Sequence, residues 1–334
     1  MALDVKVKID LSKPIGKVGS WYPLLLIVDS TAEAATYAEF TDLAELAEGG
    51  YASTTSVYKA ANLMLMQDNA PSKFAVLKMK TFATETIATY LNKGWRQVVL
   101  IDSSDSIEEL AEYIETTDKM LFVTVATTSA LSTLYEKVKT YERTFIVYHT
   151  DTANYPNAAA AVVGATAGYE AGSFTYKNII LKGVTPLDIS DTSLETDVHG
   201  KGAITILEKA GDIVTSEGKV ASGEYADIID SKDYIVQNIS YKVQKVFNNN
   251  KKVAYTNSGI SLLEVATGGV LKSAYDNGMI AEDDAGAPLY STTFALRSQT
   301  SEENRVARKY PYGQFSFELA GAIHNAEIQG EITV

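Results

Sequence analysis

The fold class is decided by residues 97–148, which contain the strand-like runs QVVLID (97–102), MLFVTV (120–125) and TFIVY (144–148). These runs are mostly apolar rather than alternating, which is typical of strands buried on both faces. Residues 106–114 and 131–139 lie between them and have the pattern of helices. Strands that alternate with helices predict parallel βαβ units, so we expect a sheet covered by helices.

The same alternation extends toward the N-terminus. Residues 23–28 (PLLLIV) predict another buried strand, and residues 56–67 have the apolar spacing of an amphipathic helix. Between them, residues 37–46 are interpreted as a helix that ends at Gly49-Gly50. The first half of the chain is therefore predicted to form one α/β domain.

Both ends of the chain have the period-2 pattern of half-buried strands. Apolar and polar side chains alternate at each end, and the apolar positions are Val5, Val7, Ile9 and Leu11 near the N-terminus and Ala326, Ile328, Ile332 and Val334 near the C-terminus. A terminal strand stays ordered only if its backbone pairs with a sheet. That sheet can belong to the same subunit or to a neighbouring subunit, to which the strand would be added.

Bulk composition excludes several classes of protein. The 334 residues are 46% hydrophobic and 21% charged, with no apolar run near the ~20 residues that cross a bilayer. This length suggests two domains, or one large domain with an insertion. There is no cysteine, and the net charge of −13 argues against a nucleic-acid coat.

Twenty tyrosines favour a chain with extensive protein contacts. The N-terminus has no apolar signal segment, so we do not expect ordinary secretion.

The sequence has no fingerprint of nucleotide binding, because neither G-x-G-x-x-G nor G-x-x-x-x-G-K-[ST] occurs after a strand. The segment Asp102-Ser103-Ser104-Asp105-Ser106 matches the D-x-S-x-S metal motif of von Willebrand A-type domains. However, Ser106 and Glu109 also form S-x-x-E, the capping box of a helix N-terminus. We favour the capping interpretation and predict no metal site.

Catalytic patterns are equally sparse. The three histidines, His149, His199 and His324, lack the spacing of a zinc site, and there is no G-x-S-x-G nucleophile motif. The acidic groups Glu108-Glu109, Glu282-Asp283-Asp284 and Glu302-Glu303 are typical of solvated helix ends or loops. We therefore predict that the chain is not an enzyme and needs no cofactor.

Residues 155–334 resemble the contractile phage-type tail sheath protein family. An alanine-rich helix precedes Ala171-Gly172-Ser173-Phe174-Thr175 and Lys177–Val184, which match a short "pGs.t..n..L.Gv" element of that family. Further blocks follow in the family's order: residues 223–227, 233–235, 253–260, 278–280, 305–308 and 321–324. Their shared order, more than any single block, carries the resemblance.

The resemblance implies a mixed α+β fold, with a βαβ-type sheet domain, a C-terminal α+β sheath domain and extended β-strand arms at both termini. The expected parts are an N-terminal strand-exchange arm (1–20), an outer α/β domain (21–190), an inner C-terminal sheath domain (191–320) and a C-terminal strand-exchange arm (321–334). The terminal apolar positions given above are then expected to take part in inter-subunit strand exchange.

The resemblance also implies a function. Subunits of such a virion structural protein form stacked hexameric rings around a tail tube, in a helical assembly that contracts to drive the tube through a cell envelope. The expected partners are further copies of the chain, the tail tube protein, and baseplate and tail terminator proteins, without nucleic acid or membrane insertion. The expected location is the tail of a bacteriophage or of another contractile injection system, assembled in the bacterial host cytoplasm.

A basic set near the C-terminus, Arg297, Arg305, Arg308 and Lys309, is predicted to face the tube, if the tube is acidic. An ordinary solvated face is the alternative interpretation of these residues. Another virion building block, such as a tail tube protein, is a second hypothesis for the whole chain. A flavodoxin-like enzyme is a third.

Overall fold

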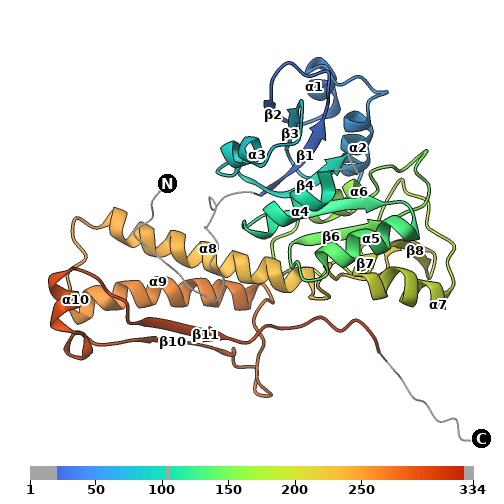
Figure 1. Cartoon of the computed structure of the whole chain (residues 1–334). Helices are drawn as coiled ribbons and strands as arrows, with labels where there is room; N and C mark the ends of the chain where they lie inside the picture. The colour runs from blue at the N-terminus through green and yellow to red at the C-terminus, as the bar shows by residue number, and fades with distance from the viewer. Residues whose placement is uncertain (1–20, 103–105, 327–334) are drawn as a thin grey trace, which may run out of the picture. The chain divides into compact units, whose positions relative to one another are not determined.

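The computed structural model describes residues 21–102 and 106–326. The chain divides into two compact units, Met1–Gln244 and Lys245–Val334, which we call the N-terminal unit and the C-terminal unit. Figure 1 shows the helices and strands of both units. Each unit is described by itself below.

The N-terminal unit is built on a sheet that has seven strands within the described residues, in the order β2-β3-β1-β4-β5-β6-β7. All neighbouring pairs are parallel except β2 with β3. The strands are β1 (Tyr22–Val28), β2 (Thr36–Phe40), β3 (Phe74–Met79), β4 (Trp95–Ile101), β5 (Met120–Val125), β6 (Thr144–Tyr148) and β7 (Ala203–Ile204). The parallel βαβ arrangement predicted from residues 97–148 is confirmed.

Helices connect these strands and cover both faces of the sheet. They are α1 (Leu43–Glu48), α2 (Ser56–Leu65), α3 (Thr84–Tyr90), α4 (Ile107–Glu115), α5 (Thr128–Val138) and α6 (Ala159–Thr166). One apolar cluster joins Leu25 and Val99 of the sheet to α2 and α6. A second joins Leu24 and Leu26 to α3, α4 and α5. Because adjacent residues of a strand point to opposite faces, one continuous apolar strand supplies both clusters.

The alanine-rich helix α6 is buried along its whole length. It approaches α2 so closely that a Cβ atom placed on Gly164 would lie 2.2 Å from the carbonyl oxygen of Met64. Only glycine allows the two backbones to approach this closely.

The rest of the N-terminal unit is made of short elements and a long helix. The short elements are α7 (Asp191–Ser193), a π-helical turn η2 (Leu194–Val198), a 3-10 turn η3 (His199–Lys201) and the hairpin of β8 (Ile206–Lys209) and β9 (Asp212–Thr215). The long helix α8 (Ala226–Asn249) begins in this unit and ends in the C-terminal unit. The two units are thus joined through a helix rather than through a loop.

The C-terminal unit contains a helix of 20 residues, α9 (Asn257–Asp276), which packs on a two-stranded antiparallel sheet. The sheet consists of β10 (Tyr290–Phe294) and β11 (Gly313–Phe317). Between these strands lie a 3-10 turn η4 (Arg297–Gln299) and the short helix α10 (Glu302–Val306). The α9 helix begins where the Thr256 side chain accepts a hydrogen bond from the Gly259 N–H group.

Two local predictions are wrong. Residues 37–46 do not form one helix, because Thr36–Phe40 forms the edge strand β2 and only Leu43–Glu48 is helical. The Asp42 side chain caps that helix, so the helix starts later than predicted. The Ser106 side chain makes no capping hydrogen bond to α4, so the predicted capping box is absent. The D-x-S-x-S segment is only partly covered, since residues 103–105 lie outside the described residues.

Within residues 21–102 and 106–326, every helix is too short or too polar to cross a bilayer.

Candidate functional site: open sheet edges and a basic end

The two-stranded sheet of the C-terminal unit has a polar face and an aromatic face. Ser291, Thr293, Gln314 and Ser316 are exposed on one side. The half-buried side carries the aromatic residues of both strands and Thr292, whose hydroxyl donates a hydrogen bond of 3.4 Å to Glu264 of α9. The sheet therefore has the alternation of a half-buried layer that packs on a helix.

Both edges of this sheet are open within the described part of the chain, because β10 and β11 pair only with each other. Their ten residues include no charged side chain and no proline, in a chain that is 21% charged. Natural proteins usually protect exposed edges with charges, prolines or bulges, because unpaired backbone groups are a template for another strand. Unprotected edges on a surface sheet are therefore a candidate site for strand addition.

The hydrogen-bond register identifies the backbone groups that point outward. Glu318 N–H donates to Leu289 C=O at 2.9 Å, and Ala295 N–H donates to Tyr312 C=O at 3.4 Å. Residues of an antiparallel pair alternate between bonding to each other and pointing away. Counting inward from these two bonds, Thr292 of β10 and Phe315 of β11 point their N–H and C=O groups away from the partner strand.

Most of the predicted strand-exchange residues lie outside the described residues: Val5, Val7, Ile9, Leu11, Ile328, Ile332 and Val334. Ala326 is described and exposed, and residues 321–326 have no regular secondary structure. The role of these residues in strand exchange stays a prediction.

The predicted basic set lies at one end of the C-terminal unit. Arg297, Arg308 and Lys309 are exposed around η4 and α10. Arg305 is instead half-buried, and its guanidinium donates to the backbone carbonyl of Thr300. Three of the four predicted side chains are therefore exposed, and the fourth, Arg305, makes a contact within the unit.

Two lysines missed by the sequence interpretation lie at the same end. Lys251 and Lys252 are exposed in the loop between α8 and α9. This loop is held beside the η4–α10 segment, because Asn257 Oδ1 accepts a hydrogen bond of 2.8 Å from Arg297 N–H and the Tyr255 hydroxyl donates at 3.0 Å to Lys309 C=O. We call Lys251, Lys252, Arg297, Arg308 and Lys309 the basic end.

A buried ionic cluster joins α8 to the sheet in the N-terminal unit. Arg96, at the start of β4, donates to Asp230 of α8 at 2.6 Å and lies 2.7 Å from Asp233. Arg143, just before β6, donates to both carboxylate oxygens of Asp233. Burial raises the pKa of Asp233, but the charges of Arg96 and Arg143 outweigh it, so that the pKa of this carboxyl is lowered.

Neighbouring polar groups complete this cluster. The Tyr176 hydroxyl donates to Asp230 at 2.7 Å, and burial raises the pKa of Tyr176 well above its usual value. Gln237 of α8 donates to Asp118 at 3.1 Å, and the Lys119 ammonium lies 3.4 Å from the same residue. Buried charges are stable only when paired, so the cluster fixes the register of α8 on the sheet.

One constellation has the distances of a catalytic relay. His199 Nε2 lies 2.9 Å from the hydroxyl of Ser216, and its Nδ1 lies 3.3 Å from Glu195. However, Ser216 is only 2% exposed, and its hydroxyl accepts a hydrogen bond from Thr205 N–H. A nucleophile must reach its substrate, so these residues stabilise the η2–η3 turn and do not form an active site.

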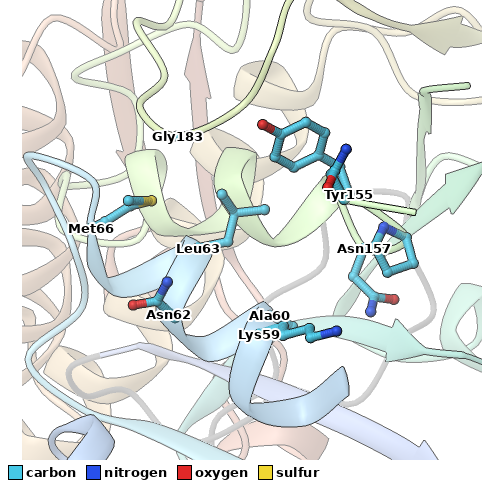
Figure 2. A pocket seen from close by; sticks show the side chains of 10 residues that line it. Lys59, Ala60, Asn62, Leu63, Met66, Tyr155, Asn157 and Gly183 are labelled. Carbon is cyan, nitrogen blue, oxygen red and sulfur yellow. The ribbon is translucent and has the colours of Figure 1, made fainter. Parts of the chain in front are cut away.

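The pocket in Figure 2 is small, and the acid–base groups of its lining are limited to Lys59 and Tyr155. Its volume is about 190 Å³, below the roughly 300 Å³ at which ligand pockets begin. It is lined by α2, by the residues around Tyr155 and Asn157, and by Gly183, with no carboxylate or imidazole. No cluster of His, Asp and Glu side chains that could hold a metal ion occurs in the described ranges.

The remaining histidines and the metal-motif aspartate are dispersed. His149 is fully buried at the end of β6, where one ring nitrogen lies 3.0 Å from the Thr185 carbonyl oxygen. His324 lies beyond β11, in the other unit. Asp102, at the end of β4, lies 3.4 Å from the Asn157 amide.

Comparison with known proteins identifies the fold. No protein-family model matches the sequence, and no curated protein matches it. The chain is similar to a chain in the six-fold symmetrised baseplate of the anti-feeding prophage, with a TM-score of 0.68, 11% identity and all of both chains covered.

Two contracted sheaths are also similar. A chain of the anti-feeding prophage helical sheath has a TM-score of 0.66 and 12% identity, over 99% of this chain and 98% of that one. A chain of the PVC sheath complex, from an extracellular contractile injection system, has a TM-score of 0.66 and 12% identity, over 100% of this chain and 97% of that one. The mixed α/β fold predicted from the sequence resemblance is confirmed.

Proposed function

We propose that this chain is a structural subunit of a contractile tail sheath and acts through contacts with copies of itself. The observation that carries the proposal is the uncharged, open-edged sheet of β10 and β11 in a chain with this fold. Such a sheet offers backbone hydrogen bonds to an added strand. The proposed role is structural and not enzymatic.

The proposed donors of that strand are the terminal segments of neighbouring copies. Residues 5–11 and 326–334 alternate between apolar and polar side chains, as β10 and β11 do. An added strand with this alternation would extend the aromatic layer on one face and the polar layer on the other. Strand exchange keeps subunits linked through backbone bonds while their bodies rotate and slide between two packings.

In this proposal the copies form hexameric rings that stack helically around a tail tube, and contraction drives the tube through a cell envelope. The free energy comes from the difference between the extended and the contracted packing, so no nucleotide is consumed. Further partners are a tail tube protein, a baseplate and a tail terminator. The particle is a phage tail or a phage-tail-like injection system, assembled in the bacterial host cytoplasm.

Tube contact by the basic residues is also part of the proposal. Arg297, Arg308 and Lys309 are exposed and can meet an acidic tube surface, whereas Arg305 supports the segment that carries them. Screened surface charge pairs contribute only about 0 to 1 kcal/mol each, which suits a contact that must be released.

A tail tube protein or another virion building block is the second candidate for the chain. Strand exchange would serve such a protein equally well. The parallel sheet covered by helices favours the sheath, because tubes are mostly β. A flavodoxin-like enzyme is less favoured, because the pocket in Figure 2 is small and contains no carboxylate or imidazole.

Terminal deletion tests the proposal. The wild-type chain is expected to form wide helical tubes in electron micrographs. Variants that lack residues 1–12 or 325–334 should keep the circular dichroism and melting temperature of the wild-type monomer but fail to form these tubes. If either truncated variant polymerises normally, strand exchange by that terminus is wrong. If the wild-type chain forms no ordered tube under any condition, the sheath function itself is wrong.

A further inference from the structure

The C-terminal unit carries opposite charges at the two ends of α9. The basic end lies at the N-terminus of this helix, where Asn257 holds the Arg297 backbone. A turn of seven residues, Glu282–Pro288, lies at its C-terminus, where the Tyr275 hydroxyl donates to Glu282 at 2.9 Å and to the Gly286 carbonyl at 3.3 Å. A helix of 20 residues is about 30 Å long. The unit therefore separates its two charged ends by about that length.

The turn, which we call the acidic turn, is exposed and internally braced. All seven residues are exposed, and Glu282, Asp283 and Asp284 are consecutive. Asp283 braces the turn, because its carboxylate accepts hydrogen bonds of 2.9 Å from both Ala285 N–H and Ala287 N–H. The backbone closes through Asp283 N–H to Ala287 C=O at 2.9 Å. A braced loop loses little conformational entropy when it docks.

None of these charges is neutralised by an ion pair among the described residues. The salt bridges of the described chain involve neither the acidic turn nor any residue of the basic end. Glu302 and Glu303 at the start of α10 offset part of the basic end, but three of its five charges stay in excess. Negative charge at the C-terminus of a helix is also unfavourable for that helix, so the stability of α9 does not explain the acidic turn.

We propose that the acidic turn of one copy docks on the basic end of a second copy. The contact is heterologous, since two different surfaces of the same chain meet, and such contacts build rings or open helical assemblies rather than two-fold dimers. This docking proposal therefore rests on the proposed sheath function. It gives the basic end a partner surface on another copy of the chain. A tail tube would compete with the acidic turn for the same side chains.

Charge reversal at each end gives a direct test. The turn variant, Glu282→Lys with Asp284→Lys, leaves the bracing Asp283 in place. The end variant, Lys251→Glu with Lys252→Glu, changes only the loop between α8 and α9. Each variant alone should raise the critical concentration for polymerisation at least about tenfold, because like charges then face each other at every contact. A mixture of both variants should polymerise as wild type does, since each supplies the complement of the other.

A matched control separates this contact from a general effect of net charge. Glu109→Lys with Glu112→Lys reverses two exposed charges on α4 and should leave polymerisation unchanged. Normal polymerisation of the turn variant would overturn the proposal, and so would a mixture that fails to recover. Loss of tube binding by the end variant alone, with a fully active turn variant, would assign the basic end to the tube instead. Absence of polymers from the wild-type chain would overturn the sheath function itself.

Discussion

Arg143 donates two hydrogen bonds to Asp233, from Nη1 at 2.7 Å and from Nη2 at 2.9 Å, one to each carboxylate oxygen. This bidentate pair joins the residue before β6 to the helix that continues into the C-terminal unit. Both side chains are buried. The pair and Arg96 thus hold the first turns of α8 against the starts of two parallel strands.

Removal of one charge from this cluster should strongly destabilise the folded protein. Asp233→Asn keeps the shape of the side chain but leaves Arg96 and Arg143 buried with one carboxylate fewer, so we expect a loss of about 3 kcal/mol in the free energy of unfolding. Urea denaturation of both proteins measures this difference in unfolding free energy. The control is Glu136→Gln, which breaks the exposed pair with Lys139 and should change the same quantity by less than about 0.5 kcal/mol. Equal effects of both variants would show that the cluster contributes no more than a surface pair.

The same carboxylate predicts a pH dependence. The charges of Arg96 and Arg143 lower the folded-state pKa of Asp233, despite its burial. Its contribution to stability is therefore present above the unfolded pKa of about 4 and is lost as the pH falls through the lower folded value. The difference in unfolding free energy between wild type and Asp233→Asn should shrink as the pH is lowered from about 5 to 2. A constant difference over this range would contradict the assignment.

Strand addition predicts an effect of one backbone N–H group. The N–H of Thr292 points away from β11, so Thr292→Pro removes a donor from the outer edge without breaking the β10–β11 ladder. The monomer should lose at most about 1 kcal/mol of stability, whereas sedimentation should show no polymer if a strand is added at the β10 edge. Thr292→Val keeps the N–H group and should polymerise normally. Polymerisation of the proline variant would exclude this edge as the acceptor.

Two glycine substitutions should have opposite effects. Gly164→Ala places a methyl group against the Met64 backbone, so α6 must move away from α2 at a cost of about 1 to 3 kcal/mol. Gly268→Ala in α9 meets no atom within 4 Å and should stabilise the monomer by up to about 1 kcal/mol through helix propensity. Chemical denaturation measures the unfolding free energy of each variant against that of the wild type. Destabilisation by Gly268→Ala would contradict the open environment of that position.

The sheet of the N-terminal unit could be predicted from sequence because its strands are buried on both faces. Short, continuous apolar runs such as QVVLI are typical of these buried strands. The segments between the runs are long enough to form the helices that connect parallel strands. The pattern of residues 37–46 is ambiguous between a strand and a helix. Half-buried Tyr37 and buried Phe40 occupy an edge strand with polar neighbours, and this short pattern also fits one turn of a helix.

The sheet of β10 and β11 and the ionic cluster could not be predicted in the same way. β10 and β11 are uncharged and short, so their pairing depends on a contact between segments about 20 residues apart. The cluster joins Arg96 and Arg143 to Asp230 and Asp233, which are distant in sequence. The sequence does carry one signal, because a basic residue, Arg96, Lys119 or Arg143, lies at or just before the start of each of the neighbouring strands β4, β5 and β6. Only tertiary packing reveals that α8 provides the opposite charges.

Under the proposed strand addition, the open edges of β10 and β11 also determine when a polymer can begin to grow. A subunit that exposes its acceptor edges as soon as it folds needs no activating cleavage, ligand or modification before it can join others. Supply of protein alone would then start polymers at random places. In the proposed assembly, ordered growth therefore requires slow spontaneous nucleation and fast elongation from a seed, so that polymers begin only where a template already presents a first ring of acceptor strands.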